Sequence, residues 1–400
     1  MHFHARKVKA RIRPFRQFAT NNCQVRRPRI RACWYVNSQL VHYNPLSQMN
    51  PRILAITNMY PSADRPWVGT FVEQQVKGLL SIGVEASVLY FDRKSEGPLI
   101  YYRMARRIHE AIAKFDPQLI HVMYGGVMAD KITDLRVSKP VVVTFHGSDV
   151  LGENLSGIWR KLISRHGVRC SWSAARKAQG IVVVARHLER ALPADVDRRK
   201  VRVIPCGIDL DQFKPMDRET CRRQLGWNPG SFQVLFPANA GDPVKRPWLA
   251  QAAVQALKEH GVNSELHLLS GVPYADVPLW INASDVLILT SLHEGSPTVV
   301  KEALACNVPV VSVEVGDVAE RIAGVEGCHL AAAEPGDLAR KLLVVANQKT
   351  RINAGPALSA LSIRNVAGQL KAFYAEVLDT RVPDMAPQWA ARTPIENPVQ

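Results

Sequence analysis

Few features of this sequence mark a secreted, membrane-spanning or metal-bound protein. The seven cysteines are scattered, odd in number and never spaced as C-x-x-C, which disfavours both a disulfide framework and a zinc site. No apolar run approaches the roughly 20 residues of a membrane span, and the first fifty residues lack the apolar core of a secretory signal. Scattered cysteines suit a reducing compartment, and we expect a cytoplasmic protein.

Acidic residues are absent from the first fifty positions, although the whole chain has 35. The same segment carries ten Lys and Arg residues, so the rest of the chain has 41 basic and 35 acidic residues and only a mild excess of positive charge. The segment shows no clear hydrophobic period. A basic tail, a targeting segment and translated sequence upstream of a start at Met49 remain open. We expect residues 1–50 to be a disordered or non-native extension.

The rest of the chain has the length and pattern of two α/β domains. A chain of 400 residues exceeds one ordinary core, and 47% hydrophobic residues is typical of globular proteins. Helical segments separate apolar runs that are typical of buried strands, at residues 52–57, 85–90, 119–123, 141–145, 180–185, 233–236, 265–269, 286–289 and 308–313. This alternation predicts doubly wound parallel sheets.

One stretch, residues 291–309, carries the strongest functional signal. It follows a predicted strand, which Gly295, Ser296 and Pro297 end before a helix predicted from Pro297 to Ala305. Ser296 is a suitable N-cap and Pro297 a suitable first helical residue. The free N–H groups at such a helix start form an anion site beyond the carboxyl end of the strand.

Two carboxylates flank this predicted anion site. Glu294 lies in the loop before the helix, and Glu302 lies inside the helix. An anion held by the amides of Ser296 to Thr298 would have an acid on each side. A nucleoside diphosphate sugar fits this layout, with its ribose near Glu302 and its sugar hydroxyls near Glu294. From spacing alone, a capped helix with two solvated acids is an equally good interpretation.

Other strand ends place candidate residues at the same edge. Gly69 and Thr70 precede a helix, where a backbone can approach a phosphate closely, although a glycine there is usually only a turn. The strand before His146-Gly147-Ser148-Asp149 delivers His146 to the cleft, and Asp149 has a second interpretation as a helix cap. Gly125 lies in a further loop at this edge.

Two patterns have ordinary interpretations. Asp209-Leu210-Asp211 matches the D-x-D pattern of some metal sites, but its position in a turn favours capping. Residues 103–115 predict a basic amphipathic helix, and such a charged face is more often simply solvated. Peripheral contact of this face with the anionic inner surface of the cell membrane is the functional alternative.

The stretch 291–309, with two glutamates eight positions apart, resembles the signature of the retaining glycosyltransferases of family 4. His146-Gly147-Ser148-Asp149 and the linker Ile204-Pro205-Cys206-Gly207-Ile208-Asp209 resemble two further elements of that family, in the same order and spacing. The resemblance covers roughly residues 52–378 and is closest to bacterial polysaccharide and teichuronic acid glycosyltransferases. It implies an α/β protein of the GT-B fold, with two Rossmann-like domains that face a cleft and a C-terminal helix that returns to the N-terminal domain.

This fold implies the domain boundaries. We expect an acceptor-side domain over residues 51–212 and a nucleotide-sugar-binding domain over residues 213–361. Residues 362–380 should form the helix that packs back on the first domain. The remainder, residues 381–400, is rich in Pro and Ala and is expected to be loose.

The resemblance also assigns roles to single residues. It places His146 and Glu294 at the transferring sugar as catalytic residues. The donor-binding residues that it implies are Gly69, Lys245, Arg246, Gly295, Ser296, Pro297, Thr298 and Glu302, and those on the acceptor side are Thr70, Gly125 and Asp149. Ala240 and Cys206 depart from the family's usual arginine and asparagine, and Arg246 is a candidate to replace the missing arginine.

We therefore expect a hexosyltransferase of cell-surface polysaccharide biosynthesis. It would move a hexose from a nucleotide sugar to a hydroxyl of a glycan or lipid-linked acceptor with retention, and would need no metal, cofactor or nucleic acid. Two alternatives remain: a nucleotide-sugar epimerase of the same fold, which should have more carboxylates in its cleft, and a nucleotide-sugar-binding protein weakened in catalysis by Ala240.

Overall fold

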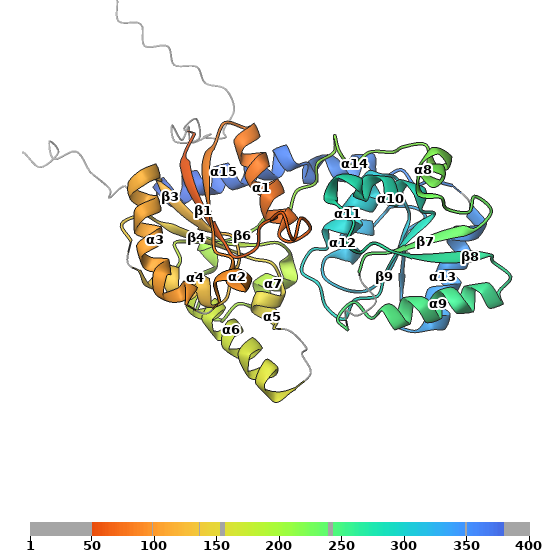
Figure 1. The fold of residues 1–400 in the computed structure, drawn as a ribbon, viewed down its shortest axis with the longest axis horizontal. Coiled ribbons are helices and arrows are strands. Elements are labelled where there is room, and N and C mark those ends of the chain that lie inside the picture. Colours follow the sequence, from red (N-terminus) through yellow and green to blue (C-terminus); the bar gives the residue numbers. More distant parts are fainter. Residues whose placement is uncertain are drawn as a thin grey trace, which may run out of the picture. The chain divides into compact units, whose positions relative to one another are not determined.

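Two parallel β-sheets, of six and five strands, form the framework of the described chain (Figure 1). This computed structural model describes residues 50–97, 99–135, 137–152, 157–238, 243–348 and 350–379. The expectations for residues 1–49, Ala240 and residues 381–400 concern positions outside these ranges. Every helix in the described ranges is too short or too polar to cross a bilayer.

The first sheet has the strand order β2-β1-β3-β4-β5-β6. Its strands are β1 (Arg52–Thr57), β2 (Glu85–Tyr90), β3 (Leu119–Val122), β4 (Val141–Phe145), β5 (Gly180–Val183) and β6 (Val201–Val203). Its helices are α1 (Thr70–Ser81), α2 (Arg93–Glu96), α3 (Ile100–Phe115), α4 (Val127–Asp134), α5 (Ser148–Leu151), α6 (Ile158–Lys177) and α7 (Arg186–Ala191). Leu54 and Ile53, adjacent in β1, enter different cores, so helices cover both faces of this sheet.

The second sheet has the order β11-β10-β9-β7-β8. Its strands are β7 (Phe232–Phe236), β8 (Ser264–Leu268), β9 (Val286–Leu289), β10 (Val310–Val313) and β11 (His329–Ala331). The helices around it are α8 (Arg218–Leu225), α9 (Pro247–Glu259), α10 (Val277–Ala283), α11 (Thr298–Ala305), α12 (Val318–Ile322), α13 (Pro335–Gln348) and α14 (Gly355–Leu358). All strand pairs in both sheets are parallel, as predicted.

Sequence periodicity located the strands of four or more residues and missed the two strands of three residues. The bounds of β1, β2, β4 and β9 match the prediction, and the strand predicted from residue 308 begins at Val310. Val308 instead donates its amide to the carbonyl of Ala303 and ends helix α11. Strands β6 and β11 were missed because each has only three residues and lies at a sheet edge, where no apolar run marks it.

The C-terminal helix α15 (Ile363–Asp379) packs on the first sheet, as the GT-B prediction requires. Leu370, Phe373 and Tyr374 share a core with Ile53 of β1. Gly180 permits this contact, because a Cβ there would lie 2.8 Å from a methyl carbon of Val377 and 2.9 Å from the Phe373 ring. Helix α15, which follows the elements of the second sheet in the chain, therefore contributes to the core of the first sheet.

A buried polar chain attaches α15 to this sheet. The Tyr374 hydroxyl lies 2.7 Å from Nδ1 of His121, and Nε2 of His121 lies 2.6 Å from the Thr144 hydroxyl. Burial lowers the pKa of His121 to about 3, so the imidazole is neutral at physiological pH. Each ring nitrogen thus has one partner, and removal of either partner leaves a buried polar atom unpaired.

We predict that Tyr374→Phe destabilises the protein. Loss of the hydroxyl leaves Nδ1 of His121 without its partner, which costs about 1–3 kcal/mol of unfolding free energy. Thermal unfolding measures the effect. Tyr102→Phe is the matched control, because Tyr102 is 85% exposed and should tolerate the same change. Equal melting temperatures for the two variants would contradict this role of the buried chain.

Candidate active site

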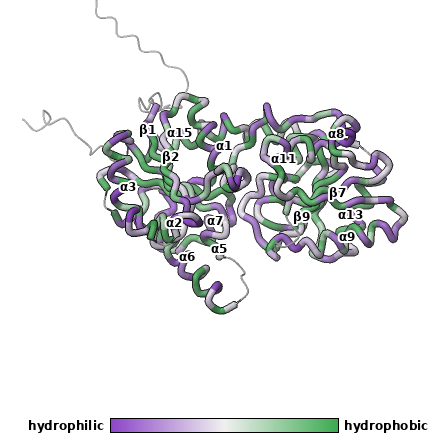
Figure 2. Tube along the Cα trace, viewed as in Figure 1, coloured by the Kyte–Doolittle hydropathy of each residue, from purple (hydrophilic) through white to green (hydrophobic). Residues whose placement is uncertain are grey.

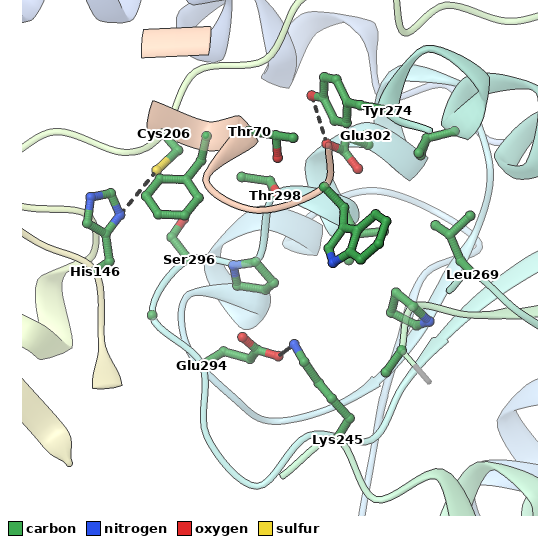
Figure 3. Close-up of a pocket in the computed structure, with 18 of the residues that line it drawn as sticks. Thr70, His146, Cys206, Lys245, Leu269, Tyr274, Glu294, Ser296, Thr298 and Glu302 are labelled. Atoms are coloured by element: carbon green, nitrogen blue, oxygen red, sulfur yellow. Dashed lines mark hydrogen bonds and ion pairs between the residues drawn. The ribbon is translucent and has the colours of Figure 1, made fainter. Parts of the chain in front are cut away.

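A cavity of about 700 Å³ lies at the carboxyl ends of strands from both sheets (Figure 3). Most of the predicted site residues line it: Thr70, His146, Lys245, Glu294, Gly295, Ser296, Pro297, Thr298 and Glu302. Parallel strands bring residues far apart in sequence to one edge, so β4 delivers His146 while β9 delivers the loop with Glu294. The structure thus brings together the two predicted catalytic residues and the helix start.

The start of α11 differs from the prediction. The helix begins at Thr298, with extended Pro297 in the N-cap position and no side chain bonded to the cap amides. The expectation that Ser296 caps this helix is wrong. Its hydroxyl donates to Asp317 Oδ2 at 2.7 Å and accepts from Lys301 Nζ at 3.0 Å. Bonds to charged groups are stronger than a bond to a backbone amide, so the helix start stays uncapped by side chains.

Two glycines let the edges of the two sheets touch. A Cβ at Gly295 would overlap the carbonyl oxygen of His146. Gly147 has a φ of 138°, and a Cβ there would lie 3.0 Å from the amide nitrogen of Gly295. The loop after β4 therefore meets the loop after β9 backbone to backbone, and this contact brings His146 to the same cavity as the start of α11.

Glu294 is held by partners from three segments. Its carboxylate pairs with Lys245 Nζ at 2.5 Å and accepts from the Ser291 hydroxyl at 2.7 Å. Its main-chain carbonyl accepts from Nε2 of His187 on α7 at 3.2 Å. Figure 3 shows the lysine and the carboxylate directed at each other within the cavity. The carboxylate therefore lies beside Lys245, one of the two basic residues that the sequence analysis expects at the donor phosphates.

His146 uses both ring nitrogens inside the protein. Nε2 donates to the Met123 carbonyl at 3.0 Å, and Nδ1 lies 3.8 Å from the sulfur of Cys206. Phe71 packs on the ring with a centroid separation of 4.5 Å. Burial lowers the pKa of His146 to about 4, so the ring is neutral near pH 7. It presents a neutral ring surface to the cavity and no cation.

Glu302 is a buried acid at the opposite side of the helix start. It is 4% exposed, and one carboxylate oxygen accepts from the Tyr274 hydroxyl at 3.1 Å. Burial raises the pKa of Glu302 to about 7. The side chain therefore changes protonation state within the physiological range, although, apart from Lys301, the other buried residues of its helix are apolar.

Comparison with known proteins shows the family of this chain. The family models described as Glycosyltransferase Family 4 and Glycosyl transferases group 1 match residues 61–212 and 239–348. The chain belongs to the family 4 type of glycosyltransferases. A putative teichuronic acid biosynthesis glycosyltransferase, TuaC of Bacillus subtilis, is 25% identical over 67% of this chain and 82% of its own length. A D-inositol 3-phosphate glycosyltransferase of Geodermatophilus obscurus is 28% identical over 40% of this chain and 43% of its own length.

Solved structures confirm the GT-B fold of this glycosyltransferase. A sucrose-phosphate synthase of Thermosynechococcus elongatus superposes with a TM-score of 0.67 at 16% identity, covering 82% of this chain and 100% of its own. HepE of Anabaena, in complex with UDP and glucose, superposes with a TM-score of 0.57 at 18% identity, with the same coverages. At such identities the similarity establishes the fold alone.

Four predicted site residues of the glycosyltransferase do not line this cavity. The Arg246 side chain donates to the carbonyls of Thr290 at 2.6 Å and Ser291 at 3.2 Å. Its guanidinium is thus occupied by the backbone, which does not support the predicted replacement of the arginine missing at Ala240. Gly69 has a φ of 69°, and a Cβ there would overlap the backbone of Met59, so it permits a tight loop.

Asp149 and Gly125 support the His146 loop from behind. The Asp149 carboxylate accepts from the amides of His146 at 3.0 Å, Gly147 at 2.8 Å and Gly125 at 3.0 Å. Both residues line a neighbouring cavity of about 400 Å³ together with Tyr124. Burial raises the pKa of Asp149, and the amide bonds counteract this rise. Its position explains how the loop keeps its shape.

In a turn outside the site, Asp209 accepts from the amides of Asp211 and Gln212 at 2.9 and 3.2 Å, which confirms the capping interpretation of the D-x-D pattern.

Lys301 is a residue that the sequence analysis missed. It is 0% exposed and donates to the Cys206 carbonyl at 2.9 Å and to the Ser296 hydroxyl at 3.0 Å. Burial lowers its pKa. The sequence did contain a signal for this buried lysine, because a charged residue lies between Val300 and Glu302 in a mostly apolar helix. Lys301 connects α11 of the second sheet to the linker that follows β6 of the first.

We predict that Lys301→Met destabilises the glycosyltransferase. The Cys206 carbonyl loses its donor in a buried position, at a cost of about 1–3 kcal/mol of unfolding free energy. Lys258→Met is the control, since Lys258 is exposed on α9. Thermal unfolding of both variants decides the matter. A Lys301→Met variant as stable as Lys258→Met would show that the buried link between α11 and the linker contributes nothing.

Proposed function

We propose that this glycosyltransferase moves a hexose from a nucleoside diphosphate sugar to a hydroxyl acceptor, with retention, in the assembly of a cell-surface polysaccharide. One observation carries the proposal: the uncapped start of α11 lies in a cavity between Glu294 on one side and Glu302 on the other, with Lys245 beside them. This combination offers sites for a sugar, a diphosphate and a ribose in the order in which a nucleotide sugar presents them.

The diphosphate would bind the N–H groups of Gly295, Ser296 and Thr298 and the ammonium of Lys245. A helix start favours anions through its unpaired N–H groups and its dipole. Lys245 pairs with Glu294 in the absence of donor. The diphosphate would draw Lys245 toward itself, and the Glu294 carboxylate would then be available to the hydroxyls of the transferring sugar.

The chemical step would break the bond between the anomeric carbon and the diphosphate oxygen, and the acceptor oxygen would bond to that carbon on the same face. The proton of the acceptor hydroxyl would pass to the leaving diphosphate. Negative charge grows on the leaving diphosphate as the bond breaks. In the donor complex, Lys245 and the helix amides would already contact the diphosphate before the bond breaks, so they would stabilise this charge without further reorganisation. His146, neutral and packed against Phe71, would contact the sugar through its ring.

The ribose would contact Glu302, whose side chain lines the cavity beside Tyr274. HepE of Anabaena has structures with UDP and with UDP-glucose, and UDP-glucose is therefore the first donor to test. The likeness to a putative teichuronic acid biosynthesis enzyme supports a polysaccharide acceptor. Release of nucleoside diphosphate that depends on acceptor would establish transfer, whereas donor binding without release would indicate a binding protein.

We predict that Glu294→Gln lowers kcat more than it raises KM. Contacts of Glu294 with the sugar should strengthen as the glycosidic bond breaks, so their loss acts mainly on the transition state. His146→Ala should have the same pattern, because both residues are placed at the sugar. Glu326→Gln, at an exposed position, is the control for loss of a carboxylate. Wild-type kcat in both site variants would put the reaction elsewhere.

We predict that donor affinity decreases as the pH falls below about 7. Glu302 has a pKa of about 7 without donor, and its ionised form accepts hydrogen bonds from ribose hydroxyls more strongly than its protonated form does. Protonation below that pH should therefore weaken UDP-glucose binding, by up to about tenfold per pH unit. Calorimetric titrations from acid to mildly alkaline pH measure this dependence.

Glu302→Gln should remove the pH dependence, because the amide does not titrate. The variant should also bind UDP-glucose more weakly above pH 7, since a hydrogen bond to a charged group contributes about 1.5–3 kcal/mol. Glu259→Gln, on the exposed end of α9, should behave as wild type. A Glu302→Gln variant that keeps the wild-type pH profile would assign the titration to another group.

A further inference from the structure

Helix α6 exposes a set of large apolar side chains that its sheet does not cover. Figure 1 shows the N-terminal part of this helix extending beyond the other elements of the first sheet. Within this part, Trp159 is 76% exposed, Ile158 71%, Ile163 64% and Leu162 47%. These positions follow the spacing i, i+1, i+4 and i+5, which places them on one face of the helix. Water therefore contacts an apolar stripe instead of the usual polar surface.

The rest of the exposed part of α6 is basic. The helix contains Arg160, Lys161, Arg165 and Arg169 in its first twelve residues and no acidic residue anywhere along its length. These four side chains form no ion pair with any residue of the described ranges. Figure 2 shows hydrophobic and hydrophilic residues side by side along α6. An apolar stripe bordered by basic residues and free of acids is the pattern of a helix that lies in the surface of an anionic bilayer.

Helix α3, the basic helix that the sequence suggested for membrane contact, is less suited to this role. Arg107 pairs with Glu96 at 2.8 Å and Arg106 with Glu110 at 2.7 Å. The Arg107 guanidinium also lies over the Phe91 ring, 4.5 Å from its centroid. Two of its basic side chains are thus engaged within the protein, and the helix offers less uncompensated charge than α6.

The basic side of α6 continues toward the active site. Lys161, Arg165 and Arg169 line a groove of about 830 Å³ together with Trp172 and His293. His293 immediately precedes Glu294 in the loop that lines the cavity. A phosphate-bearing surface held by α6 would therefore lie next to the loop that carries a predicted catalytic residue.

We propose that the exposed part of α6 docks on an anionic membrane surface. Its apolar stripe would enter the region between headgroups and acyl chains, and its basic residues would contact lipid phosphates. Charge complementarity selects this occupant. The exposed part of the helix has four basic residues and no acid, so it repels a second copy of itself and attracts an anionic surface. The proposal concerns the protein without donor, so its failure would leave the proposed transfer reaction untouched.

The experiment compares variants of the full chain on vesicles of phosphatidylcholine with and without phosphatidylglycerol. Trp159→Ala should weaken binding to the anionic vesicles about tenfold, since the indole loses its burial. Trp248→Ala is the matched control, because Trp248 is 59% exposed on α9. Arg165→Glu should weaken binding about 20-fold at low salt, with a smaller effect at high salt. Lys258→Glu is its control, and all variants should keep the wild-type melting temperature.

Hydrogen exchange locates the contact. Anionic vesicles should slow amide exchange in peptides that cover residues 158–169, and this local readout is insensitive to binding through the basic N-terminal segment. Vesicle binding without protection of α6 would overturn the proposal, as would Arg103→Glu on α3 weakening binding as much as Arg165→Glu. Protection of α6 that rises with protein concentration in the absence of vesicles would identify an interface between copies and would also overturn it.

Discussion

Helix α11 has to present its first amides to the cavity without a side chain that caps them, and the surrounding structure meets this requirement with a buried lysine. Lys301 and Asp317 bind the Ser296 hydroxyl and hold it away from the helix start. A buried ammonium is costly unless its donors are satisfied, and the Cys206 carbonyl provides a further acceptor. The same lysine therefore helps to leave the helix start uncapped and joins the second sheet to the linker from the first.

The charged side chains at the cavity have partners within the protein. Glu294 holds Lys245, and Glu302 accepts from Tyr274. These pairs satisfy the groups in the absence of a ligand, when unpaired charges would be costly to keep partly buried. A diphosphate could exchange partners with Lys245 at little cost, because one charge-assisted bond replaces another. The arrangement would therefore suit the proposed binding and release of a diphosphate.

The contact between the two sheet edges depends on residues without side chains. Gly295 and Gly147 allow the backbones of the loops after β9 and β4 to come into contact. Any Cβ at Gly295 would overlap the His146 carbonyl. Asp149 then fixes the His146 loop through three backbone amides. Two loops from different sheets thus act as one surface, which is necessary if His146 and Glu294 are to contact the same sugar.

Local patterns predicted well what depends on neighbours in sequence. Buried strands such as β1 and β9 are continuous apolar runs, and parallel strands deliver their following residues to one edge, so His146 and Glu294 could be expected in the same cleft. Capping by Ser296 failed as a prediction because its competitor Asp317 lies 21 positions away. The contacts of Arg246 could not be predicted for the same reason, since the carbonyls that bind it are 44 and 45 positions away.

The sequence by itself determined the two-sheet α/β architecture, the position of the helix start between two acids, and the family to which these motifs belong. Only the tertiary structure decided which charges face the cavity, that Lys301 is a buried link, and that α6 exposes its apolar stripe. The physical reason is that a strand or helix follows from the period of a local segment, whereas the partner of a charged or polar group is set by whatever folding places within hydrogen-bond distance of it.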